Sequence, residues 1–193
     1  ADGRYTTPVT LNDDGRVTSH RYPSFAADGR GQVVVAWLDA RDRDAAGGKD
    51  AGYKGVSLYA AESADNGRSF GSNRRVAEHT CECCRTALAW GKDGAVGFWR
   101  NLFDGGVRDF ALQWLARRDG VVRATDDDWK IDACPHHGGG VAVDGAGRAH
   151  YVWFTNGAKR QGLFYGNRLN AAVATPIPLG NPDAQPGHPD VAA

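Results

Sequence analysis

Four cysteines and three histidines are placed where they could bind a metal ion. Three cysteines fall within four residues, and the fourth precedes a histidine pair. The full set is Cys81, Cys83, Cys84, Cys134, His136, His137 and His188. Thiolate sulfur together with imidazole nitrogen favours zinc or copper. We therefore expect a site for a soft metal ion, copper or zinc, and no organic cofactor.

The same residues are compatible with two other kinds of chemistry. A disulfide between Cys134 and either Cys83 or Cys84 would join two distant segments, with His136 and His137 packed beside it. Such a bond contributes roughly 2–4 kcal/mol to stability. Redox chemistry would require a thiol of low pKa. A mixed arrangement would have one disulfide, with the remaining pair of cysteines and the histidines free to bind metal.

Charge and composition exclude several classes of protein. The 23 basic and 23 acidic side chains give a formal net charge of zero, which argues against a nucleic-acid partner. Hydrophobic residues make up 41% of the 193 residues, enough for a packed core. No apolar run approaches the roughly 20 residues that span a bilayer. The even number of cysteines favours an oxidising compartment, so we expect a periplasmic or secreted protein.

A repeated hairpin organises the chain. Each copy has a short apolar run, a glycine-containing turn and a second apolar or aromatic run, which predicts antiparallel strands. Phe25, Leu88, Val141 and Val191 occupy matching positions, at spacings of 63, 53 and 50 residues. A second pair of apolar runs follows each of the first three hairpins, ending at residues 74–76, 129–131 and 177–179, which gives four strands per repeat. Repeats of this length and strand number are typical of the blades of an all-β propeller.

The repeat divides the single propeller region, residues 1–193, into five parts. Residues 1–19 would be the end of one blade, residues 20–80, 81–133 and 134–187 three complete blades, and residues 188–193 the start of another. Propellers close with roughly 4–8 blades. Three blades alone would leave two apolar faces open, so we expect the remainder of the propeller as a partner. The absence of Met and the start at Ala1 favour a fragment of a longer chain, and a six-bladed ring of two copies is the alternative.

One turn carries the motif of a known family. Ser63, Asp65, Gly67 and Phe70 fit the pattern S-x-D-x-G-x-x-F, and the chain resembles the sialidase-like propellers that contain this Asp-box, or BNR repeat. In that family the box is structural: the Asp accepts amide hydrogen bonds, the Gly supplies a permissive backbone and the aromatic ring packs against the blade. The resemblance implies a sialidase-like β-propeller. Members include hydrolases, lectin-like binders and proteins with neither activity.

The resemblance also implies where ligands bind. Loops that precede the inner strands of these propellers line a central channel, so the cysteines and histidines would gather at its mouth. The leading prediction is an exported binding protein whose Cys/His cluster binds a soft metal. The alternatives are a non-catalytic glycan-binding module and an exo-sialidase. In the latter, Arg21 would grip the substrate carboxylate and Asp42 would be the acid/base. Arg21 is equally explained as a structural arginine of the channel, and whether the chain is an enzyme stays open.

Three further segments have local predictions. Residues 41–44 alternate in charge and predict a solvated loop, and residues 126–128 predict a solvated acidic turn. The three consecutive glycines at 138–140 lack the strand–turn–helix context of a phosphate loop. They predict instead a close approach between backbone segments.

Overall fold

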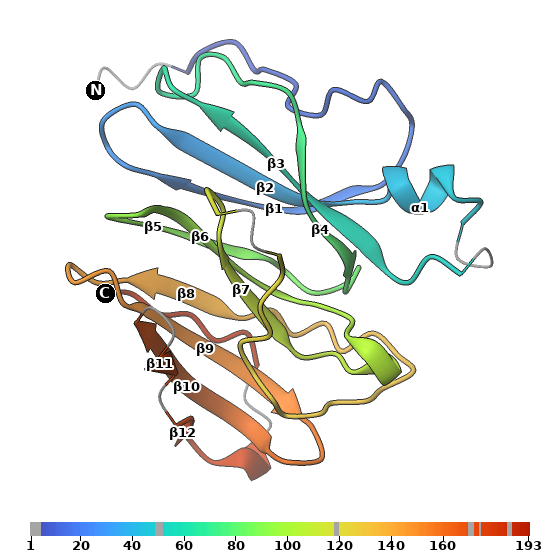
Figure 1. Ribbon diagram of the computed structural model, residues 1–193, viewed down its shortest axis with the longest axis vertical. Helices are drawn as coiled ribbons and strands as arrows, with labels where there is room; N and C mark the ends of the chain where they lie inside the picture. Colours follow the sequence, from blue (N-terminus) through green and yellow to red (C-terminus); the bar gives the residue numbers. More distant parts are fainter. Residues whose placement is uncertain (1–4, 49–51, 118–119, 170–171, 174, 185–186) are drawn as a thin grey trace.

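The computed structural model describes residues 5–48, 52–117, 120–169, 172–173, 175–184 and 187–193 (Figure 1). These residues form an all-β fold of three antiparallel sheets, which confirms the all-β part of the prediction. No sheet among them closes into a barrel. The segment expected to end a preceding blade lies partly outside the described residues, and its described part, residues 5–19, contains no strand.

The first sheet contains four strands in sequential order. They are β1 (His20–Ala27), β2 (Val33–Asp39), β3 (Val56–Ser63) and β4 (Arg74–Thr80). A short helix, α1 (Arg41–Ala45), follows β2, so the prediction of a loop at residues 41–44 was wrong. Within the described part of the chain, no helix is long and apolar enough to cross a membrane.

The second sheet departs from the expected four strands. It contains β5 (Ala87–Gly91), β6 (Gly94–Arg100) and β7 (Phe110–Trp114), with the 3-10 turn η2 (Asp104–Gly106) before β7. A fourth strand is absent from the described residues. In its place, isolated bridges join Val107 to Lys130 and Ala111 to Arg123.

The third sheet has an outer edge shared by two short strands. Its members are β8 (Gly140–Val143), β9 (Ala149–Asn156), β10 (Gln161–Leu169), β11 (Ala172–Val173) and β12 (Ile177–Leu179), followed by the 3-10 turn η3 (Pro182–Ala184). Strand β9 pairs with one edge of β10 along its length, and β11 and β12 pair with successive parts of the other edge. Residues 188–193 contain no strand in this structure.

The three sheets pack face to face, as Figure 1 shows from top to bottom of the view. Their first strands lie side by side, with β1 against β5 and β5 against β8. Leu58 of the first sheet packs with Trp99 of the second in one core cluster. Phe98 of the second sheet packs with Trp153 of the third in the other. Burial of apolar side chains between successive sheets therefore holds the loops at the ends of the sheets in place.

Buried tryptophans find polar partners in each sheet. Trp37 Nε1 donates to Asp39 (2.8 Å), Trp99 Nε1 donates to Asn101 (3.1 Å), and Trp153 Nε1 donates to Asp127 (2.8 Å). Asp127 is only 1% exposed, and burial raises the pKa of its carboxyl. The prediction of a solvated turn was therefore wrong for this residue, because its carboxylate satisfies a buried indole N–H.

The Asp-box residues form the turn between β3 and β4. Asp65 accepts hydrogen bonds from the backbone N–H groups of Arg68 and Ser69 (both 2.9 Å) and from the Ser63 hydroxyl (2.8 Å). Hydrogen bonds from Ser69 make the largest contribution in lowering the pKa of Asp65 below its usual range. Gly67 has a φ of 78°, which glycine tolerates without a Cβ clash. The local roles predicted for Asp65 and Gly67 are confirmed, and Phe70 lies beside Gly67.

Candidate metal centre

Residues 81–84, here called the cysteine loop, connect the first sheet to the second. Thr80, at the end of β4, forms a β-bridge with Asn101 just beyond β6. The Cys81 N–H then donates to the Arg100 carbonyl (2.9 Å), and the Cys84 N–H reaches back to the Cys81 carbonyl (3.5 Å). This tight turn over the end of β6 gathers the three thiols of the loop into one buried cluster.

The spacing of the three sulfur atoms fits a bound metal ion. Cys81 Sγ lies 3.5 Å from both Cys83 Sγ and Cys84 Sγ, and the latter two are 4.0 Å apart. A disulfide would bring two sulfurs to about 2.05 Å. In tetrahedral zinc–thiolate coordination, with Zn–S bonds near 2.3 Å, the sulfurs are about 3.8 Å apart. The observed separations bracket that value, so the loop presents three ligands at the distances an ion would impose.

The disulfide alternative does not describe this structure. All four cysteines are free: the three in the loop are buried, and Cys134 is exposed. Cys134 nevertheless lies close to the loop. Its sulfur, the sulfur of Cys83 and a ring nitrogen of His136 are within 4.8 Å of one another. Cys83 therefore belongs to two groups of potential ligands, one buried and one that includes two exposed side chains.

His136 reaches this position through an unusual backbone. Its φ is 56°, in the left-handed region that residues other than glycine seldom adopt. Such conformations persist only where surrounding structure holds them, and they cluster at functional sites. His136 and Cys134 both lie in the segment that leads into β8, so this group joins the second and third sheets.

Two arginines place positive charge beside the thiols. Arg108 Nη1 donates to Cys81 Sγ (3.4 Å). Hydrogen bonds from Cys83 and Cys84, together with the Arg108 charge, lower the pKa of Cys81 far below its usual range. The hydrogen bond to Cys81 in turn raises the pKa of Cys83 and of Cys84. The buried Arg100 interacts with Cys84. One thiolate is thus favoured before any ion binds, and the others must lose protons on binding.

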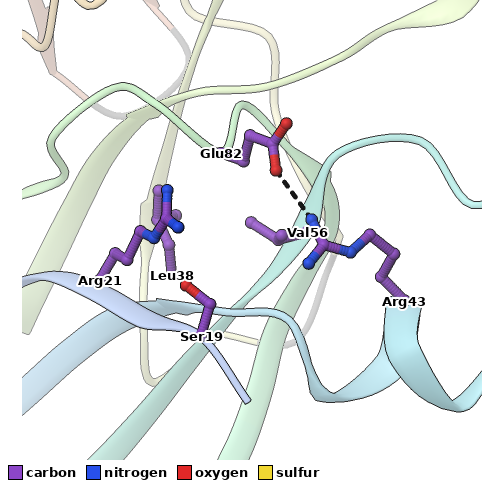
Figure 2. Close-up of a pocket in the computed structure, with 6 residues that line it drawn as sticks. All are labelled: Ser19, Arg21, Leu38, Arg43, Val56 and Glu82. Carbon is purple, nitrogen blue, oxygen red and sulfur yellow. Dashed lines mark hydrogen bonds and ion pairs between the residues drawn. The ribbon is translucent and has the colours of Figure 1, made fainter. Parts of the chain in front are cut away.

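An ion pair fastens the cysteine loop to α1. Arg43 Nη1 lies 2.8 Å from Glu82, the residue between Cys81 and Cys83. Figure 2 shows this pair in a small pocket lined by Ser19, Arg21, Leu38, Arg43, Val56 and Glu82. The short helix that was not predicted therefore helps to position the predicted ligands.

The two residues proposed for a sialidase site do not share this pocket. Arg21 lines it, whereas the Asp42 carboxylate accepts hydrogen bonds from the hydroxyls of Ser57 (2.6 Å) and Tyr59 (3.0 Å). Burial, followed by the hydrogen bond to Asp42, raises the pKa of Tyr59 to about 12, so this hydroxyl remains a donor. Asp42, in α1, is thus held by side chains of β3 and does not line the pocket that Arg21 lines.

Two of the predicted metal ligands lie apart from the cysteines. The rings of His137 and His188 are 5.7 Å apart, and His137 also packs on Phe154. Burial, then the Arg100 charge, lowers the pKa of His137. Within the described ranges, neither histidine belongs to a group of metal-ligating atoms. The structure thus brings together five of the seven predicted ligands and places this pair beside them.

A third group of ligand atoms is already occupied by a cation of the protein. His20 Nε2 lies 3.5 Å from Asp14 and 3.4 Å from Asp39. Arg41 lies 2.9 Å from Asp39 and 3.7 Å from Asp14, so its guanidinium neutralises these carboxylates. Asp39 also accepts the Trp37 indole N–H. This group is an ion-pair network at the end of β2.

Sequence reasoning missed Arg100 and Arg108 as neighbours of the thiols. Arg100 ends β6, and its place beside the cysteines depends on the bridge between Thr80 and Asn101, which no local pattern encodes. Neither a protein-family profile nor a curated protein sequence matches the chain. Its function is therefore inferred from the geometry of its own residues.

Proposed function

We propose that this chain is an exported binding protein of the sialidase-like β-propeller type, whose cysteine loop binds a soft metal ion, copper or zinc. One observation carries this proposal: three buried, free thiols have sulfur atoms 3.5–4.0 Å apart. Buried cysteines without a metal or a disulfide normally pack as small apolar side chains. Three sulfurs turned toward one another at ligand spacing favour metal binding instead.

The arrangement of the sheets supports the propeller assignment. The first sheet is an up-and-down array in the order β1-β2-β3-β4, as in a propeller blade. Its neighbours pack face to face with their first strands adjacent, as successive blades do. The Asp-box turn at Ser63–Phe70 lies between the third and fourth strands of its sheet, where the sialidase-like family carries it.

The surroundings of the thiols suit an ion held by three thiolates. Three bound thiolates exceed the charge of either a cuprous or a zinc ion, and the excess is negative. Arg100 and Arg108 supply compensating positive charge at Cys84 and Cys81. These guanidinium groups would also orient the sulfurs, as outer-shell partners of metal ligands do.

Metal analysis tests the proposal directly. Tag-free protein, reduced and kept anaerobic, is loaded with zinc or with Cu(I), passed over a desalting column and assayed for bound metal. Wild-type protein should retain metal, and Cys83→Ser should retain at least about tenfold less, because the Cys83 sulfur belongs to both groups of potential ligands and thiolates dominate such sites.

His79→Ala is the matched control. His79 lies two residues before the loop, but its Nδ1 contacts the Lys54 carbonyl (3.0 Å) rather than the sulfurs. This variant should retain as much metal as wild type. Failure of fully reduced wild-type protein to retain either metal would refute the proposal.

A further inference from the structure

We propose that the centre holds two cuprous ions, bridged by the Cys83 thiolate. A buried ion would be bound by Cys81, Cys83 and Cys84, and an exposed ion by Cys83, Cys134 and His136. This inference rests on the proposed function, which requires only one ion.

The geometry divides the five ligands into two sets of three. The loop thiols form one mutually close set, and Cys83, Cys134 and His136 form the other. Cys134 and His136 are not within 4.8 Å of all three loop sulfurs, so a single ion at the loop cannot use all five ligands. Cys83 is the one residue common to both sets. A thiolate sulfur has several lone pairs and so can donate to two ions.

The number of ligands selects copper over zinc for this arrangement. Each position has three protein ligands, and zinc in structural sites is almost always bound by four. Cuprous copper accepts low coordination numbers and prefers soft thiolate ligands, with imidazole also suitable. Zinc would need another donor at each position, and no further His, Cys, Asp or Glu among the described residues completes either set.

The charges around the centre balance for two cuprous ions. Four thiolates carry four negative charges. Two cuprous ions and the guanidinium groups of Arg100 and Arg108 carry four positive charges. Arg108 donates to Cys81, and Arg100 interacts with Cys84, so both guanidinium groups lie at the buried position. The negative charge of the thiolates most needs to be balanced at the buried position, because burial penalises an unbalanced charge.

The two positions differ in their access to solvent. Cys81 and Cys84 are buried, whereas Cys134 and His136 are exposed. Cys134 also lines an open pocket that includes Trp129, Phe154 and Gln161. Copper would therefore enter and leave at the exposed position. Cys83, the shared ligand, would transfer a copper ion between the exposed and the buried position. Each ligand that is still a protonated thiol releases its proton to solvent when it binds an ion.

Counting ions by native mass spectrometry tests this inference. Reduced, anaerobic, tag-free protein is titrated with Cu(I) and weighed intact. Wild-type protein should bind two copper ions per chain, and the double variant Cys134→Ser/His136→Ala should bind one. His188→Ala is the control and should bind two, since His188 belongs to neither ligand set. X-ray absorption should show a copper–copper distance in wild type that the double variant lacks.

The outcomes separate the two proposals. Binding of no copper by reduced wild type would overturn the proposed function. Binding of a single ion by wild type would overturn the two-ion centre and leave the proposed function standing, as would two ions retained by the double variant. The wild-type count and its copper–copper distance do not depend on whether any variant folds.

Discussion

Arg100 connects the cysteine loop to the core through its backbone partners. Its guanidinium is 1% exposed and donates to the carbonyls of Arg108 (2.6 Å) and Phe154 (2.9 Å). It also lies over the rings of Phe110 (4.2 Å) and Trp129 (4.6 Å). Burial lowers its pKa, opposed most by the nearby Cys84. A charge this deeply buried is stable only because every face of it has a partner.

We expect Arg100→Met to lower the free energy of unfolding by about 3 kcal/mol, because the buried carbonyls that it satisfies would lose their donor. Urea unfolding of the metal-free protein measures the change. Arg117→Met is the control: this exposed guanidinium lies over Trp114, and its loss should cost no more than about 0.5 kcal/mol. Equal losses in the two variants would contradict the role given to Arg100.

The ligands could be predicted from sequence to the extent that they are neighbours in the chain. Cys81, Cys83 and Cys84 are close in any compact fold because only four residues contain them. The approach of Cys134 and His136 to Cys83 required the repeat, which placed all three before inner strands. The sequence did not predict which histidine would lie near the sulfurs. His136 and His137 are adjacent in the chain, but only His136, whose backbone is left-handed, belongs to a group of potential ligands.

At the scale of elements, the glycines before β8 set the distance between the second and third sheets. A Cβ on Gly139 would lie 2.4 Å from the Phe98 ring and 2.7 Å from the Val152 carbonyl. A Cβ on Gly138 would lie 2.8 Å from the Arg85 carbonyl, and one on Gly140 would lie 2.8 Å from the Asp190 carboxylate. The predicted close backbone approach is confirmed, and it brings the segment containing Cys134 and His136 toward the cysteine loop.

Gly139→Ala should therefore destabilise the fold by about 1–3 kcal/mol, because a carbonyl and a packed ring would have to move apart. Chemical denaturation followed by tryptophan fluorescence gives the value. Gly145→Ala is a suitable comparison, since a Cβ there meets nothing within 4 Å. A Gly139→Ala protein as stable as the Gly145→Ala protein would show that the sheets are not in contact through this glycine.

Most strands could be predicted because their residues alternate between apolar and polar, or are continuously apolar, between glycine-containing turns. Ile177–Leu179 and the hairpins β1–β2, β5–β6 and β8–β9 lie where the sequence placed them. The outer strand of the second sheet was not correctly predicted: the run around Trp129 makes only isolated bridges. Helix α1 has five mostly charged residues and no periodic pattern of apolar residues. Its tertiary contacts, rather than the helix propensity of its sequence, therefore stabilise it.

At the scale of the molecule, bound metal would link segments that the chain keeps far apart. The cysteine loop follows the first sheet, and Cys134 and His136 precede the third. An ion that binds the folded chain and not the unfolded one stabilises the fold by mass action. A two-ion centre would therefore link all three sheets.

Saturation with Cu(I) should raise the melting temperature of wild-type protein. Free ligand at 100 times its Kd contributes about 2.7 kcal/mol per site. For a chain of this size, the stabilisation from one site corresponds to a rise in melting temperature of roughly 5–10 °C. Differential scanning calorimetry under anaerobic conditions measures the shift, and Cys83→Ser, which removes a ligand from both positions, should show a much smaller one. An equal shift in that variant would place the stabilising copper elsewhere.

The cysteine loop has a consequence for the order of assembly. The three ligands of the buried position lie within residues 81–84, between β4 and β5, and need only the first two sheets to come together. Because synthesis proceeds from the N-terminus, all three loop cysteines are made before β8. Under the two-ion proposal, Cys134 and His136 would be the last ligands to be made, so the exposed position would be the later of the two to assemble.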